Sequence, residues 1–92
     1  MGGAVRDTLT ICNEKGLHAR AAAKFVNCVK GFESDVTVEK DGVAVGGESI
    51  MGLMMLGAAI GTTIEVIVVG PDADAALEAI RKLVAGRFDE GR

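Results

Sequence analysis

The sequence predicts an α+β fold, in which a four-stranded antiparallel sheet is covered on one face by helices. Four short segments alternate apolar and polar residues, as half-buried strands do, and two longer segments repeat apolar residues with the period of a helix. Their order along the chain is βαββαβα, with a short apolar helix before the last strand. Neither long helix can bury its apolar face alone, so both are expected on the same face of the sheet. The result is an open-faced, two-layer β-sandwich.

The predicted strands are segments rich in β-branched residues, and turn residues separate them. They span residues 5–12, 35–40, 43–45 and 62–69. Asp41-Gly42 joins the second strand to the third as a hairpin, because glycine adopts positive φ at low cost. Gly70-Pro71 stops the last strand.

The first predicted helix begins within a residue of His18 and ends at Gly31, a typical C-cap residue. A second, short helix over residues 50–56 is apolar on nearly every side and has Ser49 as its N-cap. The apolar residues of the first helix fall at i, i+3, i+4 and i+7 and are Ala22, Phe25, Val26 and Val29.

The last predicted helix is capped by Asp72 and ends at Gly86. Asp74 in its first turn interacts favourably with the helix dipole. Residues 87–92 are polar and are expected to form a frayed tail, so the ordered core should span about residues 5–86. The buried stripe of this helix is predicted to be Ala73, Ala76, Leu77, Ile80 and Val84.

Length and composition predict a single domain over residues 1–92. The chain has 92 residues, and 49% of them are hydrophobic, which suffices for one modest core. The net charge is −3, and no segment gathers Lys and Arg into a block. Proteins that bind nucleic acids usually carry a basic patch, so we expect no nucleic-acid partner.

The same sequence predicts neither membrane insertion nor a bound metal. Its longest apolar run, residues 50–60, is shorter than the about 20 residues of a membrane-spanning helix. No signal peptide opens the chain, so we expect a cytoplasmic protein. Cys12 and Cys28 are expected to be reduced thiols, and one histidine with two distant cysteines makes a poor metal site. We expect no cofactor.

Chemistry is expected at His18, the only histidine, which lies where a loop turns into a helix. A helix start presents unpaired backbone N–H groups and partial positive charge, and both favour an anion. Arg20 adds a permanent cation that can grip phosphate oxygens, and a neutral imidazole is a nucleophile. These residues suit a reversibly held phosphoryl group. On these grounds alone, His18 could also be a simple exposed capping residue.

Two motifs resemble one protein family. GLHAR at residues 16–20, followed by an alanine-rich helix, and ESIMGLMMLG at residues 48–57 resemble the HPr phosphocarrier family of the bacterial phosphoenolpyruvate-dependent phosphotransferase system. The likeness runs from about Leu9 to Gly86.

The resemblance implies that His18 is phosphorylated on Nδ1 by enzyme I, itself charged from phosphoenolpyruvate, and passes the group to an enzyme II A-type domain. Arg20 is then its charge partner. Such a carrier is a substrate of other phosphotransferases and not itself an enzyme.

Ser49 matches the position at which many members of this family are phosphorylated by an ATP-dependent serine kinase. A phosphate at a helix N-cap meets free N–H groups and the helix dipole. Its charge would then disfavour docking of an acidic or apolar partner surface. The alternative is that Ser49 only caps its helix, and the sequence leaves both readings open.

Two features depart from the sugar-transport members of the family. Ala21 stands where relatives often have proline after the arginine, which leaves the helix start less preorganised but adds an N–H donor. The GRFDE ending at residues 86–90 resembles the nitrogen-related branch. The sequence therefore leaves open whether this carrier serves sugar uptake or regulation.

A carrier binds two partners in turn with one surface, which flexible methionine side chains suit. We expect Met51 and at least one of Ile50 and Met54 to be exposed beside His18, in a monomer whose site stays open. The rival hypothesis is a regulatory interaction or ligand-binding module on a split β-α-β scaffold, which needs no nucleophile. The residues expected to contact partners are Ala19, Ala21, Lys24, Ile50, Met51 and Met54.

Overall fold

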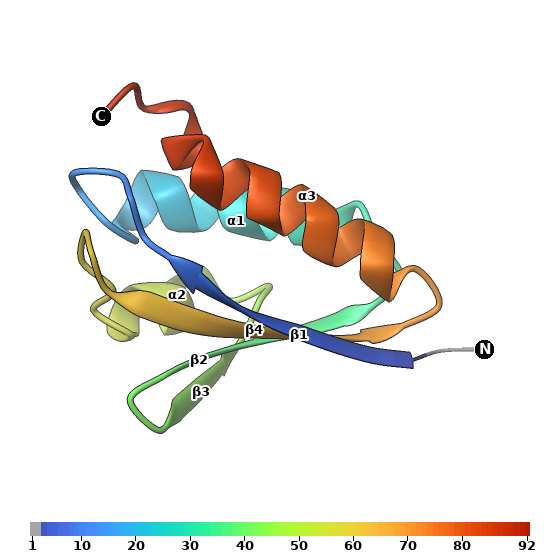
Figure 1. The fold of residues 1–92 in the computed structure, drawn as a ribbon. Coiled ribbons are helices and arrows are strands. Elements are labelled where there is room, and N and C mark those ends of the chain that lie inside the picture. The colour runs from blue at the N-terminus through green and yellow to red at the C-terminus, as the bar shows by residue number, and fades with distance from the viewer. Residues whose placement is uncertain (1–2) are drawn as a thin grey trace.

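The computed structural model describes residues 3–92 and has the predicted element order βαββαβα (Figure 1). The strands form one antiparallel sheet in the order β1-β4-β2-β3. They are β1 (Gly3–Thr10), β2 (Asp35–Lys40), β3 (Val43–Gly46) and β4 (Thr63–Gly70). The helical elements are α1 (Ala19–Lys30), α2 (Ile50–Met55), α3 (Ala73–Ala85) and a 3₁₀ turn, η1 (Arg87–Asp89).

Strands β2 and β3 form the predicted hairpin. Its turn residues Asp41 and Gly42 both have positive φ, 51° and 83°, which matches the twist of the flanking strands. Val38 pairs with Val45 across the hairpin. Strand β4 pairs with β2 on one side and with β1 on the other, so it joins the first strand to the β2–β3 hairpin within one sheet.

Helices α1 and α3 lie over the same face of the sheet (Figure 1). Every residue of their two predicted apolar stripes is buried. These stripes pack on the inward-facing side chains of the sheet, which include Val36, Val38, Ile64, Val66 and Val68. The open-faced, two-layer sandwich predicted from the sequence is thus confirmed.

Helix α2 begins at Ser49, as predicted. The Ser49 hydroxyl oxygen accepts a hydrogen bond from the N–H of Gly52 at 2.9 Å, which satisfies one of the free amides of the helix start. The helix packs against α1 and β3, and Leu53 is the α2 side chain that is buried in the core. Most of α2 therefore remains at the surface.

The end of the chain differs from the frayed tail that the sequence predicts. Phe88, in η1, is fully buried in the core. The carbonyl of Arg92 accepts a hydrogen bond from the N–H of Glu14 at 2.9 Å. Residues 87–92 are polar except for Phe88, and the prediction did not take this one apolar side chain into account. Burying a Phe side chain contributes about 1.5–3 kcal/mol. The C-terminal segment is thus tied to the loop before α1.

Asp72 also differs from its predicted role. It occupies the N-cap position of α3, but its carboxylate makes no capping hydrogen bond. That carboxylate instead accepts hydrogen bonds from the Ser34 hydroxyl and from the Glu33 N–H, and these bonds hold the pKa of Asp72 below its ordinary value. Asp72 therefore links the start of α3 to the loop after α1.

Candidate functional site

His18 lies at the N-cap of α1, after a loop that is hydrogen-bonded to the segment following α2. Its backbone is extended, its side chain is 27% exposed, and the ring makes no capping hydrogen bond to the helix. The N–H of Leu17 donates to the Ala58 carbonyl at 2.9 Å. Gly16 has φ of 65°, and a Cβ at this position would lie 2.4 Å from the same carbonyl oxygen, so the approach requires glycine. The imidazole is therefore held in place and reachable from solvent.

The start of α1 is open to an anion. Its first hydrogen bond runs from the N–H of Ala22 to the His18 carbonyl at 2.9 Å, so the amides of residues 19–21 precede the helical bonding pattern. The first turn contains no acidic residue. Free amides and the dipole at such a start favour an anion by about 0.3–1 kcal/mol.

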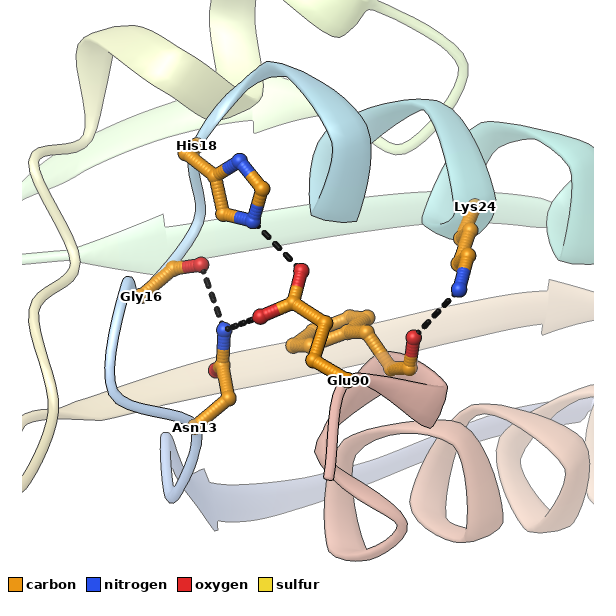
Figure 2. A network of polar contacts seen from close by, with 6 residues as sticks. Asn13, Gly16, His18, Lys24 and Glu90 are labelled. Atoms are coloured by element: carbon orange, nitrogen blue, oxygen red, sulfur yellow. Dashed lines mark hydrogen bonds and ion pairs between the residues drawn. The ribbon is translucent and has the colours of Figure 1, made fainter. Parts of the chain in front are cut away.

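A carboxylate from the end of the chain contacts the ring (Figure 2). Glu90 Oε2 lies 2.5 Å from His18 Nε2, and Glu90 Oε1 accepts a hydrogen bond from Asn13 Nδ2 at 2.9 Å. The Asn13 side chain is fully buried and also donates to the Gly16 carbonyl at 2.9 Å. The second ring nitrogen, Nδ1, points away from Glu90 (Figure 2). Glu90 thus bridges the imidazole and the loop that carries it.

The protonation of Glu90 determines the tautomer of the ring. Burial works to raise the pKa of Glu90, but the hydrogen bonds from Asn13 and His18 and the charges of His18 and Lys15 outweigh it, so the pKa lies below its ordinary value. An ionised carboxylate only accepts hydrogen bonds, so His18 Nε2 carries a proton in this contact. In the neutral ring the lone pair is then on Nδ1.

Arg20, the predicted charge partner, is exposed in the first turn of α1. Among residues 3–92, no hydrogen bond or ion pair engages its side chain, and none joins it to His18. Arg20 borders a cavity of about 660 Å³ that also reaches Glu90. The residues that line this cavity are Glu14, Lys15, Arg20, Lys24, Asp89, Glu90 and Arg92.

The structure contradicts one of the predicted partner contacts and leaves two others as predictions. Ala21 is fully buried, because the third residue of α1 faces the core, and it cannot touch a partner. The prediction for Ala21 is therefore wrong. Lys24 is half-buried, and its Nζ donates to the Phe88 carbonyl at 2.6 Å, so it holds the C-terminal turn. Ala19 is exposed.

The surface of α2 is apolar and exposed, as the sequence predicts. Met51 is 71% exposed, and Met55, which the sequence did not single out, is 78% exposed. Residues 57–59, which follow the helix, line a small hollow together with His18. The exposed large apolar side chains of α2 are Ile50, Met51, Met54 and Met55. Their role in partner binding stays a prediction.

Asn13 and Glu90 were not predicted as site residues. The sequence assigns Asn13 to a loop and Glu90 to a frayed tail, and neither segment has a periodic pattern. One signal was present: Phe88 is an aromatic residue in a polar tail. Its burial fixes where the carboxylate two residues later can reach.

Two kinds of feature are absent from residues 3–92. They contain no group of three His, Cys, Asp or Glu side chains placed to hold a metal ion. None of their helices combines the length and the apolar character that crossing a membrane requires.

An open-faced sandwich of this topology, with a single imidazole at an open helix start, defines a small phosphocarrier domain. Comparison with known proteins agrees, because a family model described as "PTS HPr component phosphorylation site" matches residues 5–86. The chain belongs to the HPr family of phosphocarrier proteins of the phosphotransferase system.

Relatives with both names used in this family match most of the chain. Phosphocarrier protein HPr of Cupriavidus necator is 48% identical over 94% of this chain and 96% of its own. Phosphocarrier protein NPr of Shewanella violacea is 44% identical over 89% and 90%. The crystal structure of HPr-C-His from Thermoanaerobacter tengcongensis has a TM-score of 0.89 and 40% identity, covering 94% of this chain and 97% of that one. These matches confirm the resemblance and disfavour the rival interaction module.

Proposed function

We propose that this chain accepts a phosphoryl group from enzyme I on Nδ1 of His18 and passes it to an enzyme II A-type domain. The observation that carries the proposal is the position of the imidazole, 27% exposed at the start of α1 and next to amides that no helical bond uses. Membership in the HPr family supports the carrier role.

The transfer uses groups already in place. The Nδ1 lone pair attacks phosphorus, the N–P bond forms, and the bond between phosphorus and the donor breaks, with its electron pair returning to the donor. The dianion then lies beside the amides of residues 19–21. The exposed guanidinium of Arg20 can add charge-assisted hydrogen bonds. These groups stabilise the adduct without neutralising it, so the step can run in reverse toward an acceptor.

The proposal is tested by incubating the full chain with enzyme I and phosphoenolpyruvate and measuring its mass. We expect a gain of one phosphoryl group that is lost in acid and is absent from His18→Ala. Acceptor domains of the sugar branch and of the nitrogen-related branch are then compared for the rate at which they remove the label. A His18→Ala protein that still gains the label would falsify the assignment of the site.

The exposed side chains of α2 are proposed to form part of the surface that binds both partners, with Ala19 at its edge. They are apolar, adaptable and adjacent to the hollow beside His18. We further propose that the chain works in the cytoplasm as a monomer, since both partners must reach one open site.

Ser49 is proposed to be a second phosphorylation site, used by a serine kinase. Its hydroxyl caps α2, where a phosphate would meet the same helix start and bring negative charge to the apolar surface. Acid-stable labelling by ATP and the kinase, lost in Ser49→Ala, is the expected result. A Ser49→Ala protein labelled as well as the wild type would contradict the proposal.

A further inference from the structure

We propose that Glu90 is a positioning residue for phosphoryl transfer: the C-terminal turn brings its carboxylate to His18 Nε2, and this contact reserves Nδ1 as the nucleophile. The inference rests on the proposed function of His18 and adds to it a residue outside the GLHAR motif. Two features of the structure carry it, the fixed orientation of Asn13 and the anchoring of the C-terminal turn. The chemistry of the phosphorylated ring adds a third argument.

The orientation of Asn13 fixes one side of the Glu90 carboxylate. Asn13 Nδ2 donates to both the Gly16 carbonyl and Glu90 Oε1, each at 2.9 Å (Figure 2). Rotating the amide by half a turn would place its oxygen against these two acceptors, so Asn13 can only be a donor here. Glu90 Oε1 is therefore committed to Asn13, and Oε2 is left for His18.

The C-terminal turn is anchored on both sides of Glu90. Arg87, Phe88 and Asp89 all have positive φ, between 54° and 62°, a conformation that is costly for residues other than glycine. Buried Phe88 and the bond from Lys24 to its carbonyl hold the turn before Glu90. The bond from the Glu14 N–H to the Arg92 carbonyl holds the chain after it. These contacts on both sides of Glu90 position its carboxylate against the His18 ring.

The charge of the His18 ring changes during transfer, and the Glu90 carboxylate contacts this ring. When Nδ1 forms its bond to phosphorus, the ring keeps the proton on Nε2 and becomes cationic. The carboxylate of Glu90 stabilises this cation directly. When an acceptor takes the phosphoryl group, the electron pair of the N–P bond returns to Nδ1, and a neutral imidazole leaves with no proton transfer. Loss of the Nε2 proton would make the leaving group an imidazolate, which is far more basic.

Replacing one oxygen of the Glu90 carboxylate with NH₂ tests the inference. In Glu90→Gln, the side-chain oxygen must accept from Asn13, so the NH₂ group faces His18 Nε2 and requires it to be an acceptor. The proton of the neutral ring then moves to Nδ1. Glu90→Ala removes both contacts, so neither tautomer of the His18 ring is imposed. We therefore expect Glu90→Gln to be more harmful than the larger deletion.

The experiment measures ¹⁵N chemical shifts of the His18 ring in the unphosphorylated full chain, and then the rate of phosphorylation by enzyme I. We expect Nε2–H in the wild type, Nδ1–H in Glu90→Gln and a mixture in Glu90→Ala. We expect the rate to fall about tenfold or more in Glu90→Gln, and less in Glu90→Ala. Glu14→Gln, which makes the same charge change in the same cavity, is the matched control and should keep the wild-type tautomer.

A wild-type tautomer in Glu90→Gln, with a phosphorylation rate like that of Glu14→Gln, would overturn the inference. So would an Nδ1–H tautomer in the wild type. The dispersion of amide resonances shows whether each variant is folded. If no protein, the wild type included, is labelled by enzyme I, the proposed function fails, while the tautomers still report on Glu90 independently.

Discussion

The start of α2 is capped by the side chain of its N-cap residue, whereas the start of α1 is not. The hydroxyl of Ser49 accepts a hydrogen bond from Gly52 at 2.9 Å and uses one amide of α2 for stability. His18 occupies the same position on α1 but makes no capping bond, and its ring is held by Glu90 instead. A capped start is stable and an uncapped start is free to bind an anion. This difference supports the proposal that the start of α1 holds the phosphoryl group of His18.

Placing a capping residue at the open start of α1 should have the largest effect. His18→Ser and His18→Ala should both abolish labelling by enzyme I, because each removes the nucleophile. The two variants should differ in stability, since a serine cap is worth about 1 kcal/mol more than alanine. Urea unfolding measures this difference. Equal free energies of unfolding would show that this helix start has no free amide for a cap to satisfy.

Removing the nearby cation should weaken anion binding at the open start. We expect Arg20→Gln to lower the rate of His18 phosphorylation by about ten- to hundredfold, since a hydrogen bond to a charged group contributes about 1.5–3 kcal/mol. Arg20→Lys should recover part of the rate, because lysine keeps the charge and loses the fork. Arg6→Gln makes the same charge change on β1 and is the control. An Arg20→Gln protein as fast as Arg6→Gln would exclude Arg20 as charge partner.

Removing the cap of α2 should cost stability. We expect Ser49→Ala to lower the free energy of unfolding by about 1 kcal/mol, whereas Ser49→Thr keeps a hydroxyl and most of this contribution. Thermal and urea unfolding measure both. Identical stability of the alanine and threonine variants would mean that the bond to Gly52 contributes nothing.

The start of α3 shows a third arrangement, in which the N-cap carboxylate bonds a neighbouring loop and not its own helix. Asp72 bonds Ser34 and Glu33, and its pKa is lowered, so its contribution to stability is present above the ordinary pKa of 3.8 and is lost as pH falls through the folded-state value. We expect Asp72→Asn to lower Tm at neutral pH by a few degrees at most, and the difference to shrink below about pH 4. A difference that persists unchanged into acid would contradict this account.

The sequence predicted those parts of the molecule that follow a periodic pattern or a local turn rule. The stripes of α1 and α3, the Asp41-Gly42 hairpin and the Ser49 cap belong to this class. Asp72 was predicted to be a cap for the same local reason, but the loop after α1 supplies better donors, which a local rule cannot anticipate.

The site was predictable only in part. His18 and Arg20 lie two residues apart at a helix start, so their proximity is local. Glu90 reaches His18 from 72 residues away, because Phe88 is buried and turns the chain back. Ala21 was misplaced for a related reason: which face of α1 meets the core depends on how the helix docks. Contacts of this kind depend on the tertiary fold.

The position of the phosphorus atom in the phosphorylated chain tests the assignment of Nδ1 of His18. The ¹⁵N-labelled chain is phosphorylated with enzyme I and phosphoenolpyruvate, and the coupling between ³¹P and ¹⁵N is measured by NMR. We expect coupling to Nδ1 of His18, with the proton still on Nε2. Phosphorus coupled to Nε2, or a label on any other residue, would contradict the account.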